Sequence, residues 1–208
     1  MNARLATDRL ELRLPPESRD SRRRQVGAIA IDDDAMAHFN ALLAQLDANA
    51  PHVSADQMVT LARWLQDQPR DDAMAVLSER LGRAEQLRRM LNDSDWDVPG
   101  DTRERARMLI SYLQQVQDLI PDDQPLVGHL DDALLVELSW PAFAAETVDY
   151  VDFCRFRSQE RPRGSAAERR LAWETACLAE AALLQQRRQV RARPYAAAPR
   201  LPDFLRVT

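Results

Sequence analysis

Four aspartates gather near the middle of this 208-residue chain, on either side of a predicted turn. Asp118 and Asp122 precede the turn, whereas Asp131 and Asp132 follow it, with His129 beside the second pair. Carboxylate oxygens bind divalent cations, and a bound cation can activate water for hydrolysis. Alternatively, the later two aspartates cap a helix and the earlier two bond to backbone groups in the turn. The pattern favours this second interpretation because aspartates are common at helix starts.

Two amphipathic segments are expected to position these carboxylates. Apolar residues between positions 109 and 120 repeat at helical spacing, and Pro121 ends that helix because it lacks a backbone donor. After the turn, Asp131 or Asp132 can cap a second helix that carries leucines at helical spacing. The sequence therefore predicts a helical hairpin over residues 105–140.

The string DLIPDDQPLVGHLDD, at positions 118–132, resembles the signature of the YkvA-like family, a small bacterial domain of unknown function. The matching residues are Asp118, Ile120, Pro121, Asp122, Gly128, Leu130, Asp131 and Asp132. The chain departs from the family pattern at Asp123 and Gln124, where an apolar residue is usual. Some relatives carry this hairpin beside membrane-spanning segments. The resemblance covers only residues 109–140 and implies no particular activity.

Helical patterns separated by proline or capping residues fill the chain from residue 32 onward. The aspartates at positions 32–34 can cap the first helix, and Ser54 with Gln57 makes a capping box for the next. They predict a mainly α protein, with a bundle of about seven helices over residues 32–193. A polar linker over residues 92–100 allows a subdomain boundary, and Trp96 within it is expected to fold back as a loop anchor. The longest predicted helix follows Ser165, whose pairing with Glu168 makes a capping box, and it carries several leucines.

The two ends of the chain lack this helical pattern. Residues 1–31 form a predicted arm, in which residues 9–14 and 25–31 have β character and could pair as a small hairpin. Residues 194–208 begin with a proline and contain two more, so we expect an extended tail.

All 28 basic residues are arginine, and charge is unevenly distributed along the chain. Residues 31–152 contain 9 arginines and 24 acidic residues, a net charge of −15, whereas residues 153–208 contain 12 arginines and 5 acidic residues, a net charge of +7. A basic C-terminal helix that neutralises an acidic bundle explains this pattern, which favours protein over nucleic acid as a partner. The arginines that could contact an anionic partner are Arg22, Arg23, Arg24, Arg187, Arg188, Arg191 and Arg193.

Other patterns limit the class of protein. No apolar run reaches the roughly 20 residues of a membrane span, and the first 31 residues lack the apolar core of a secretion signal, so we expect a cytoplasmic protein. No phosphate-binding loop, dinucleotide fingerprint or nucleophile motif is present. Cys154 and Cys177 are expected to be buried free thiols.

These observations predict a non-enzymatic protein-interaction, scaffold or regulatory module without a cofactor. The alternative is a divalent-cation-binding protein or metal-dependent hydrolase that uses the aspartate cluster. A weaker alternative is contact with nucleic acid or an anionic membrane through the arginine-rich ends. The oligomeric state does not follow from these patterns.

Overall fold

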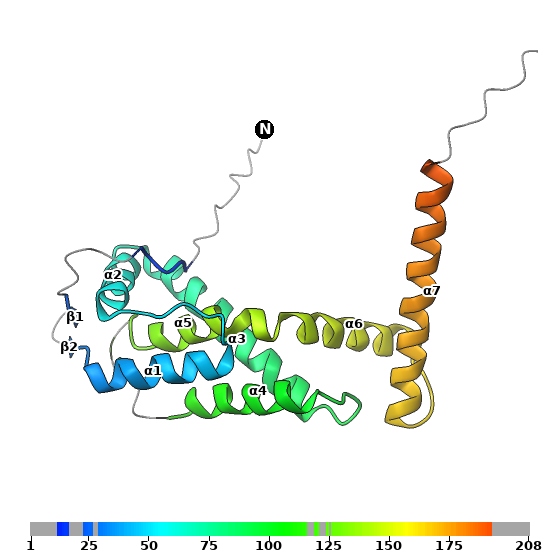
Figure 1. Cartoon of the computed structure of the whole chain (residues 1–208), viewed down its shortest axis with the longest axis horizontal. Coiled ribbons are helices and arrows are strands. Elements are labelled where there is room, and N and C mark those ends of the chain that lie inside the picture. The colour runs from blue at the N-terminus through cyan, green and yellow to red at the C-terminus, as the bar shows by residue number, and fades with distance from the viewer. Residues whose placement is uncertain are drawn as a thin grey trace, which may run out of the picture. The chain divides into compact units, whose positions relative to one another are not determined.

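The computed structural model describes residues 12–16, 23–26, 29–115, 119–120, 124 and 126–192. Within these residues the chain forms seven α-helices, one short 3-10 helix and a pair of two-residue strands (Figure 1). The prediction of a mainly α fold with about seven helices is therefore confirmed. The chain divides into two compact units, Met1–Cys154 and Arg155–Thr208.

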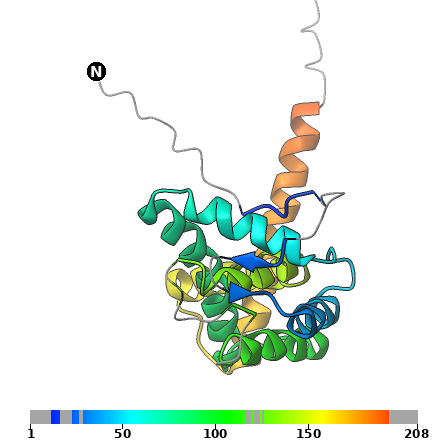
Figure 2. The ribbon, with the colours of Figure 1, turned by 90° about the vertical axis from the view of Figure 1, so that its left-hand side faces the viewer.

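The first unit contains nearly all of the elements. They are β1 (Gln25–Val26), β2 (Ile29–Ala30), α1 (Asp33–Leu46), α2 (Ala55–Gln66), α3 (Arg70–Asn92), α4 (Gly100–Tyr112), α5 (Leu130–Ser139), the 3-10 helix η1 (Trp140–Ala142) and most of α6 (Ala144–Glu160). Helices α4 and α5 each contact both α1 and α3, so these four helices surround a common core (Figures 1 and 2). The fully buried Phe39, Leu87, Leu109 and Leu130 come from the four helices in turn.

The predicted hairpin over residues 105–140 does contain two helices joined by a loop. These helices, α4 and α5, lie on opposite sides of the common core, because α1 and α3 each pack against both of them. Helices α4 and α5 are therefore connected in two ways: the loop joins them along the chain, and their apolar faces both pack against α1 and α3. The hairpin is a part of the first unit's core and not a separate module.

Local capping explains where two of these helices begin. The side chain of Asp32 accepts the backbone N–H groups of Asp34 and Ala35 at 3.1 and 3.0 Å, which starts α1. Ser54 and Gln57 form a reciprocal capping box at the start of α2. Both starts agree with the sequence prediction, because a cap satisfies donors only a few residues away.

The small β-hairpin differs from the predicted one. Both strands lie within residues 25–31, where Gln25 pairs with Ala30 in antiparallel register. This pairing closes a shorter loop than pairing with residues 9–14 would, so it costs less conformational entropy. The described residues 12–16 form no strand, but Leu12 is buried and the Pro15 carbonyl accepts a hydrogen bond from Gln57 at 2.6 Å. This part of the arm therefore packs on α2.

Trp96 attaches the linker over residues 92–100 to the first unit. Its side chain is buried, and its ring centroid lies 5.7 Å from that of Tyr150 and 5.2 Å from that of Phe153. Its indole N–H donates to Oε1 of Glu146 at 2.8 Å. Trp96 is therefore the loop anchor that the sequence predicts, and it holds the linker against α6.

The second unit begins within α6 and contains α7 (Ala166–Ala192). The compact units thus divide after Cys154, whereas the sequence allowed a boundary at residues 92–100. Oε2 of Glu168 accepts the backbone N–H of Ser165 at 2.7 Å, and Oγ of Ser165 accepts the backbone N–H of Glu168 at 3.3 Å. The hydrogen bonds that the Glu168 carboxylate accepts from the backbone N–H and the hydroxyl of Ser165 lower its pKa. The predicted tail at residues 194–208 lies outside the described residues.

Candidate functional site

The start of α5 holds the later half of the aspartate cluster. Helix α5 begins at Leu130 with His129 at its N-terminal boundary and no side-chain cap. Asp131 and Asp132 therefore lie in the first helical turn and not at the capping position that the sequence predicts. The helix starts earlier because Leu130 is fully buried in the core. Both carboxylates are buried too, and the positive end of the helix dipole stabilises their charge.

Asp131 connects α5 to the segment that precedes it. Its Oδ2 accepts the backbone N–H of Ile120 at 3.2 Å, within the core. The prediction that the preceding helix continues to Ile120 is wrong, since α4 ends at Tyr112. Ile120 is fully buried outside any helix and gives its N–H to a carboxylate eleven residues later. This hydrogen bond has a structural role, because it satisfies a buried backbone donor.

The divalent-cation hypothesis depends on the whole cluster. Asp118 and Asp122 lie outside the described residues. His129 is exposed, and its Nδ1 lies 3.9 Å from Oδ2 of Asp132. Across the part of the chain that the structure describes, no three His, Cys, Asp or Glu side chains are grouped so as to hold a metal ion. The described half of the cluster thus consists of two buried carboxylates and one exposed imidazole.

Arg23 and Arg24, two of the arginines predicted to contact an anion, form ion pairs within the first unit. Nε of Arg23 donates to Oδ1 of Asp56 at 2.7 Å, and Asp56 is buried. Arg24 pairs with Asp33 at the start of α1, and that contact raises the pKa of Arg24. Arg22 lies outside the described residues. An anionic partner would therefore compete with Asp33 and Asp56 for these two guanidinium groups.

A cleft of about 310 Å³ lies beside these ion pairs. Its lining includes Arg23, Arg24, Asp33, Asp56, Asn40, His52, Met36 and Val53. The side-chain amide of Asn40 donates to the carbonyl of Val53 and accepts its N–H, both at 2.8 Å, so Asn40 closes one wall. The two arginines and two aspartates balance in charge. The cleft therefore has little net attraction for an anion.

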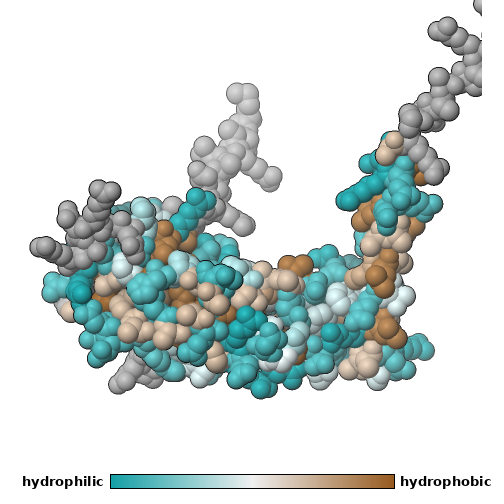
Figure 3. Space-filling view, in the orientation of Figure 1, coloured by the Kyte–Doolittle hydropathy of each residue, from teal (hydrophilic) through white to brown (hydrophobic). Residues whose placement is uncertain are grey.

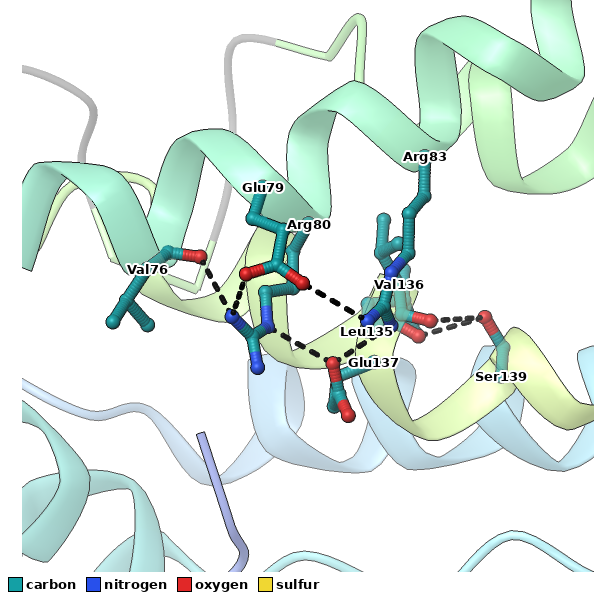
Figure 4. A network of polar contacts seen from close by, with 8 residues as sticks. All are labelled: Val76, Glu79, Arg80, Arg83, Leu135, Val136, Glu137 and Ser139. Carbon is teal, nitrogen blue, oxygen red and sulfur yellow. Dashed lines mark hydrogen bonds and ion pairs between the residues drawn. The ribbon is translucent and has the colours of Figure 1, made fainter. Parts of the chain in front are cut away.

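An ion-pair network that the sequence analysis did not single out joins α3 to α5 (Figure 4). Arg80 is buried, and its Nε donates to Oε2 of Glu137 at 3.0 Å. Arg83 donates to the same oxygen at 2.9 Å, and Glu79 pairs with both arginines at 3.2 and 3.5 Å. Arg80 also donates to the Val76 carbonyl at 3.3 Å. Glu137 thus accepts hydrogen bonds from two guanidinium groups at once.

A sequence signal for this network was present in α3. Arg80 is spaced by helical intervals from the buried Val76, Leu77, Ala84 and Leu87. A charged residue at such a core-facing position requires a partner, because an unpaired charge is costly to bury. The sequence alone does not identify that partner. Glu137 lies 57 residues away, and only the packing of α5 on α3 brings it to Arg80.

Tyr150 extends the contacts around Trp96. Its hydroxyl donates to Oδ2 of Asp93 at 3.1 Å. Burial raises the pKa of Tyr150 above its ordinary value, and the nearby Cys154 and Asp93 raise it further. Cys154 and Cys177 are both free thiols, and both are half-buried, so they are less buried than the sequence predicts.

Helix α7 exposes its large aliphatic side chains. Leu171, Leu178, Leu183, Leu184 and Val190 are 63%, 72%, 55%, 47% and 62% exposed. None of its 27 residues, all of which the structure describes, is buried. Figure 3 shows apolar patches along this helix between hydrophilic ones. Exposed aliphatic residues repeated along one helix are typical of a surface that another helix or protein covers.

The C-terminal end of α7 is basic. Arg187, Arg188 and Arg191 are all exposed there, and Arg193 lies outside the described residues. No acidic residue follows Glu180 within α7. This end of the helix therefore carries a concentrated positive charge beside its aliphatic residues.

No family model, curated protein or solved structure matches the chain. The resemblance of residues 118–132 to the YkvA-like family therefore stays a prediction. Among the described residues, no helix combines the length and the apolar character needed to cross a membrane.

Proposed function

We propose that this protein is a non-enzymatic interaction module whose contact surface is α7. The observation that carries the proposal is a 27-residue helix with no buried residue and five exposed large aliphatic side chains. Covering a leucine or valine side chain fully gains about 1.5–3 kcal/mol. A partner that covers α7 would therefore gain substantial free energy from these residues.

Helix α7 has local features that let it present this surface. The Ser165–Glu168 capping box stabilises its start, and an ion pair between Arg170 and Glu174 at 3.5 Å spans one turn. Each of these contributes only modestly, and long helices in water are stabilised mainly by packing of an apolar face. Binding of a partner would supply that packing.

The first unit supports a non-enzymatic role. Its prominent buried polar side chains are engaged in contacts that join helices and loops. Asp131 accepts the Ile120 N–H, Arg80 pairs with Glu137, and Tyr150 donates to Asp93. Buried polar groups with such partners specify how elements pack. We therefore assign the first unit the role of a scaffold.

The proposal is tested by capture with the immobilised full chain. Wild type is compared with a Leu178→Glu/Leu183→Glu double variant in a bacterial lysate, and retained proteins are quantified by mass spectrometry. We expect the double variant to lose proteins that wild type retains, because buried glutamates without partners oppose binding. Val148→Glu is the matched control, since Val148 is 67% exposed on α6. Equal retention by wild type and the double variant would refute α7 as the contact surface.

An anionic partner is the second candidate function, and the exposed Arg187, Arg188 and Arg191 favour it. Arginine binds phosphate oxygens in a planar, bidentate manner, and such binding weakens steeply with salt. The test measures binding of fluorescent duplex DNA to the full chain by anisotropy at low and physiological salt. Arg187→Glu/Arg188→Glu should abolish binding if this end of α7 is the contact. Unchanged binding would reject it.

A further inference from the structure

We infer that a second copy of this chain covers α7, by forming an antiparallel helix pair; this inference rests on the proposed interaction role of α7. The four most exposed aliphatic residues of α7 form two pairs, each seven residues apart. Leu171 and Leu178 form one row, and Leu183 and Val190 form the other. With 3.6 residues per turn, the rows lie about 120° apart around the helix axis. They therefore border one face of the helix.

Mostly small residues lie between the two rows. From Leu171 to Val190, the residues that fall between the rows on the helical wheel are Thr175, Ala179, Ala182 and the longer Gln186, and all four are exposed. Small side chains along the middle of a face let a second helix approach closely, while longer side chains on both borders interdigitate. The half-buried Trp173 and Cys177 lie on the opposite side of α7. The face between the rows is therefore the more exposed side of the helix.

The two rows are related by a symmetry that suits a second copy. Leu171 and Val190 are equally far from the point midway between Glu180 and Ala181, and so are Leu178 and Leu183. A two-fold axis at this point places Leu171 of one copy level with Val190 of the other, and Leu178 level with Leu183. A two-fold contact requires such a self-complementary surface. A partner of different sequence would not require it.

Charge selects the antiparallel orientation. Residues 166–180 contain three glutamates and two arginines, a net charge of −1, whereas residues 181–192 contain three arginines and no acid, a net charge of +3. An antiparallel pair places the basic half of each helix beside the acidic half of the other. A parallel pair would place the two basic halves together, where they repel.

Sedimentation velocity on the full chain, from micromolar to millimolar concentration, tests self-association. Wild type should convert from monomer to dimer over this range. Leu178→Glu/Leu183→Glu should raise the dimer dissociation constant by about a hundredfold or more, because it removes two leucines from each copy. Leu184→Glu, on the other side of the helix, should leave it nearly unchanged. Far-UV circular dichroism checks that each variant stays helical.

Crosslinking with a short bismaleimide tests the orientation. In the antiparallel pair, the two copies of residue 179 are about 4.5 Å apart along the axis, whereas the two copies of residue 190 are about 28 Å apart. Ala179→Cys should therefore crosslink to itself, and Val190→Cys should not. A mixture of Leu171→Cys and Val190→Cys chains should crosslink. The parent chain, with its native Cys154 and Cys177, gives the background.

The outcomes separate the two proposals. A wild-type chain that stays monomeric at millimolar concentration overturns self-association, whereas self-crosslinking of Val190→Cys at the level of Ala179→Cys overturns the antiparallel orientation. If that monomeric chain still loses captured proteins on Leu178→Glu/Leu183→Glu, the interaction role of α7 stands without the dimer. If the double variant changes neither self-association nor capture, both proposals are wrong.

Discussion

The Arg80–Glu137 ion pair between α3 and α5 should respond unequally to removal of its two members. Glu137→Met leaves the guanidinium of Arg80, which is 4% exposed, with Glu79 and the Val76 carbonyl as its remaining described partners in the network. Arg80→Met instead leaves Glu137 paired with Arg83 at 2.9 Å. The charge that remains after the first change is buried, whereas the charge that remains after the second is partly solvated and paired.

The expected costs follow from this difference. Removing one partner of a buried ion pair costs about 3–5 kcal/mol, but the 27% exposure of the Glu137 side chain screens the contact, so we expect about 2–3 kcal/mol for Glu137→Met. Arg80→Met replaces a buried charge by an apolar side chain of similar length and should change stability by less than about 1 kcal/mol. In an Arg80→Met background, Glu137→Met should cost only about 1 kcal/mol, a coupling of about 1–2 kcal/mol.

Urea unfolding monitored by far-UV circular dichroism gives the three free energies, and thermal melting gives a second measure. Glu137→Met should lower Tm by roughly 5–10 °C, given about 2–4 °C per kcal/mol for a chain of this size. Glu79→Met is the control, because Glu79 is half-exposed and Arg80 keeps Glu137 when it is removed. The reasoning fails if Arg80→Met destabilises as much as Glu137→Met, or if the double variant shows the sum of the single effects.

Four further predictions concern the first unit. Trp96→Phe keeps an aromatic ring but removes the five-membered ring of the indole with the N–H donated to Glu146, so unfolding in urea should become easier by at least about 1–2 kcal/mol; no change would reject the hydrogen bond as a stabilising contact. Burial raises the pKa of Tyr150 in the folded protein. The contribution of its protonated hydroxyl to the free energy of unfolding is therefore fully present below the pKa of tyrosine in the unfolded chain, about 10, and declines as pH rises above that value. Wild type should therefore lose stability above about pH 10 more steeply than Tyr150→Phe, and parallel pH profiles would contradict this. Asp131→Asn keeps an acceptor for the Ile120 N–H, whereas Asp131→Leu removes it and should cost about 2–3 kcal/mol more. If the carboxylates are structural, melting in EDTA and in millimolar Mg²⁺, Mn²⁺, Ca²⁺ or Zn²⁺ should give the same Tm; a cation-specific rise lost in Asp131→Asn would instead support the divalent-cation alternative.

Helix starts could be predicted where the capping contact is local. Asp32 and Ser54 cap helices within three residues of their own positions, so the sequence shows both partners together. The anchoring role of Trp96 was also predictable, since a large aromatic in a polar linker usually finds apolar cover. The end of α4 was not predictable in this way. Periodicity continues to Ile120, but that residue gives its N–H to Asp131 across the loop.

The candidate site was predicted in its residues and not in its geometry. The sequence identifies Asp131 and Asp132 as chemically distinctive, but it predicts that they cap the helix. Packing of the buried Leu130 moves both into the first turn of α5 and buries their carboxylates. For Arg23 and Arg24, the sequence shows adjacent positive charges, while the fold pairs them with Asp56 and Asp33. Their availability to an anionic partner therefore depends on contacts that no local pattern contains.

The sequence by itself determined the helical class, two of the helix starts in the first unit and the capping box of α7, because these depend on periodicity and on hydrogen bonds between near neighbours. Only the tertiary structure decided which charges are buried together and which aliphatic faces stay exposed. Arg80 meets Glu137 because α5 packs on α3, and the leucines of α7 remain in water because no described element buries them. A side chain is buried when distant segments of the chain pack around it. A helical pattern alone therefore does not show whether its apolar residues face a core or a partner.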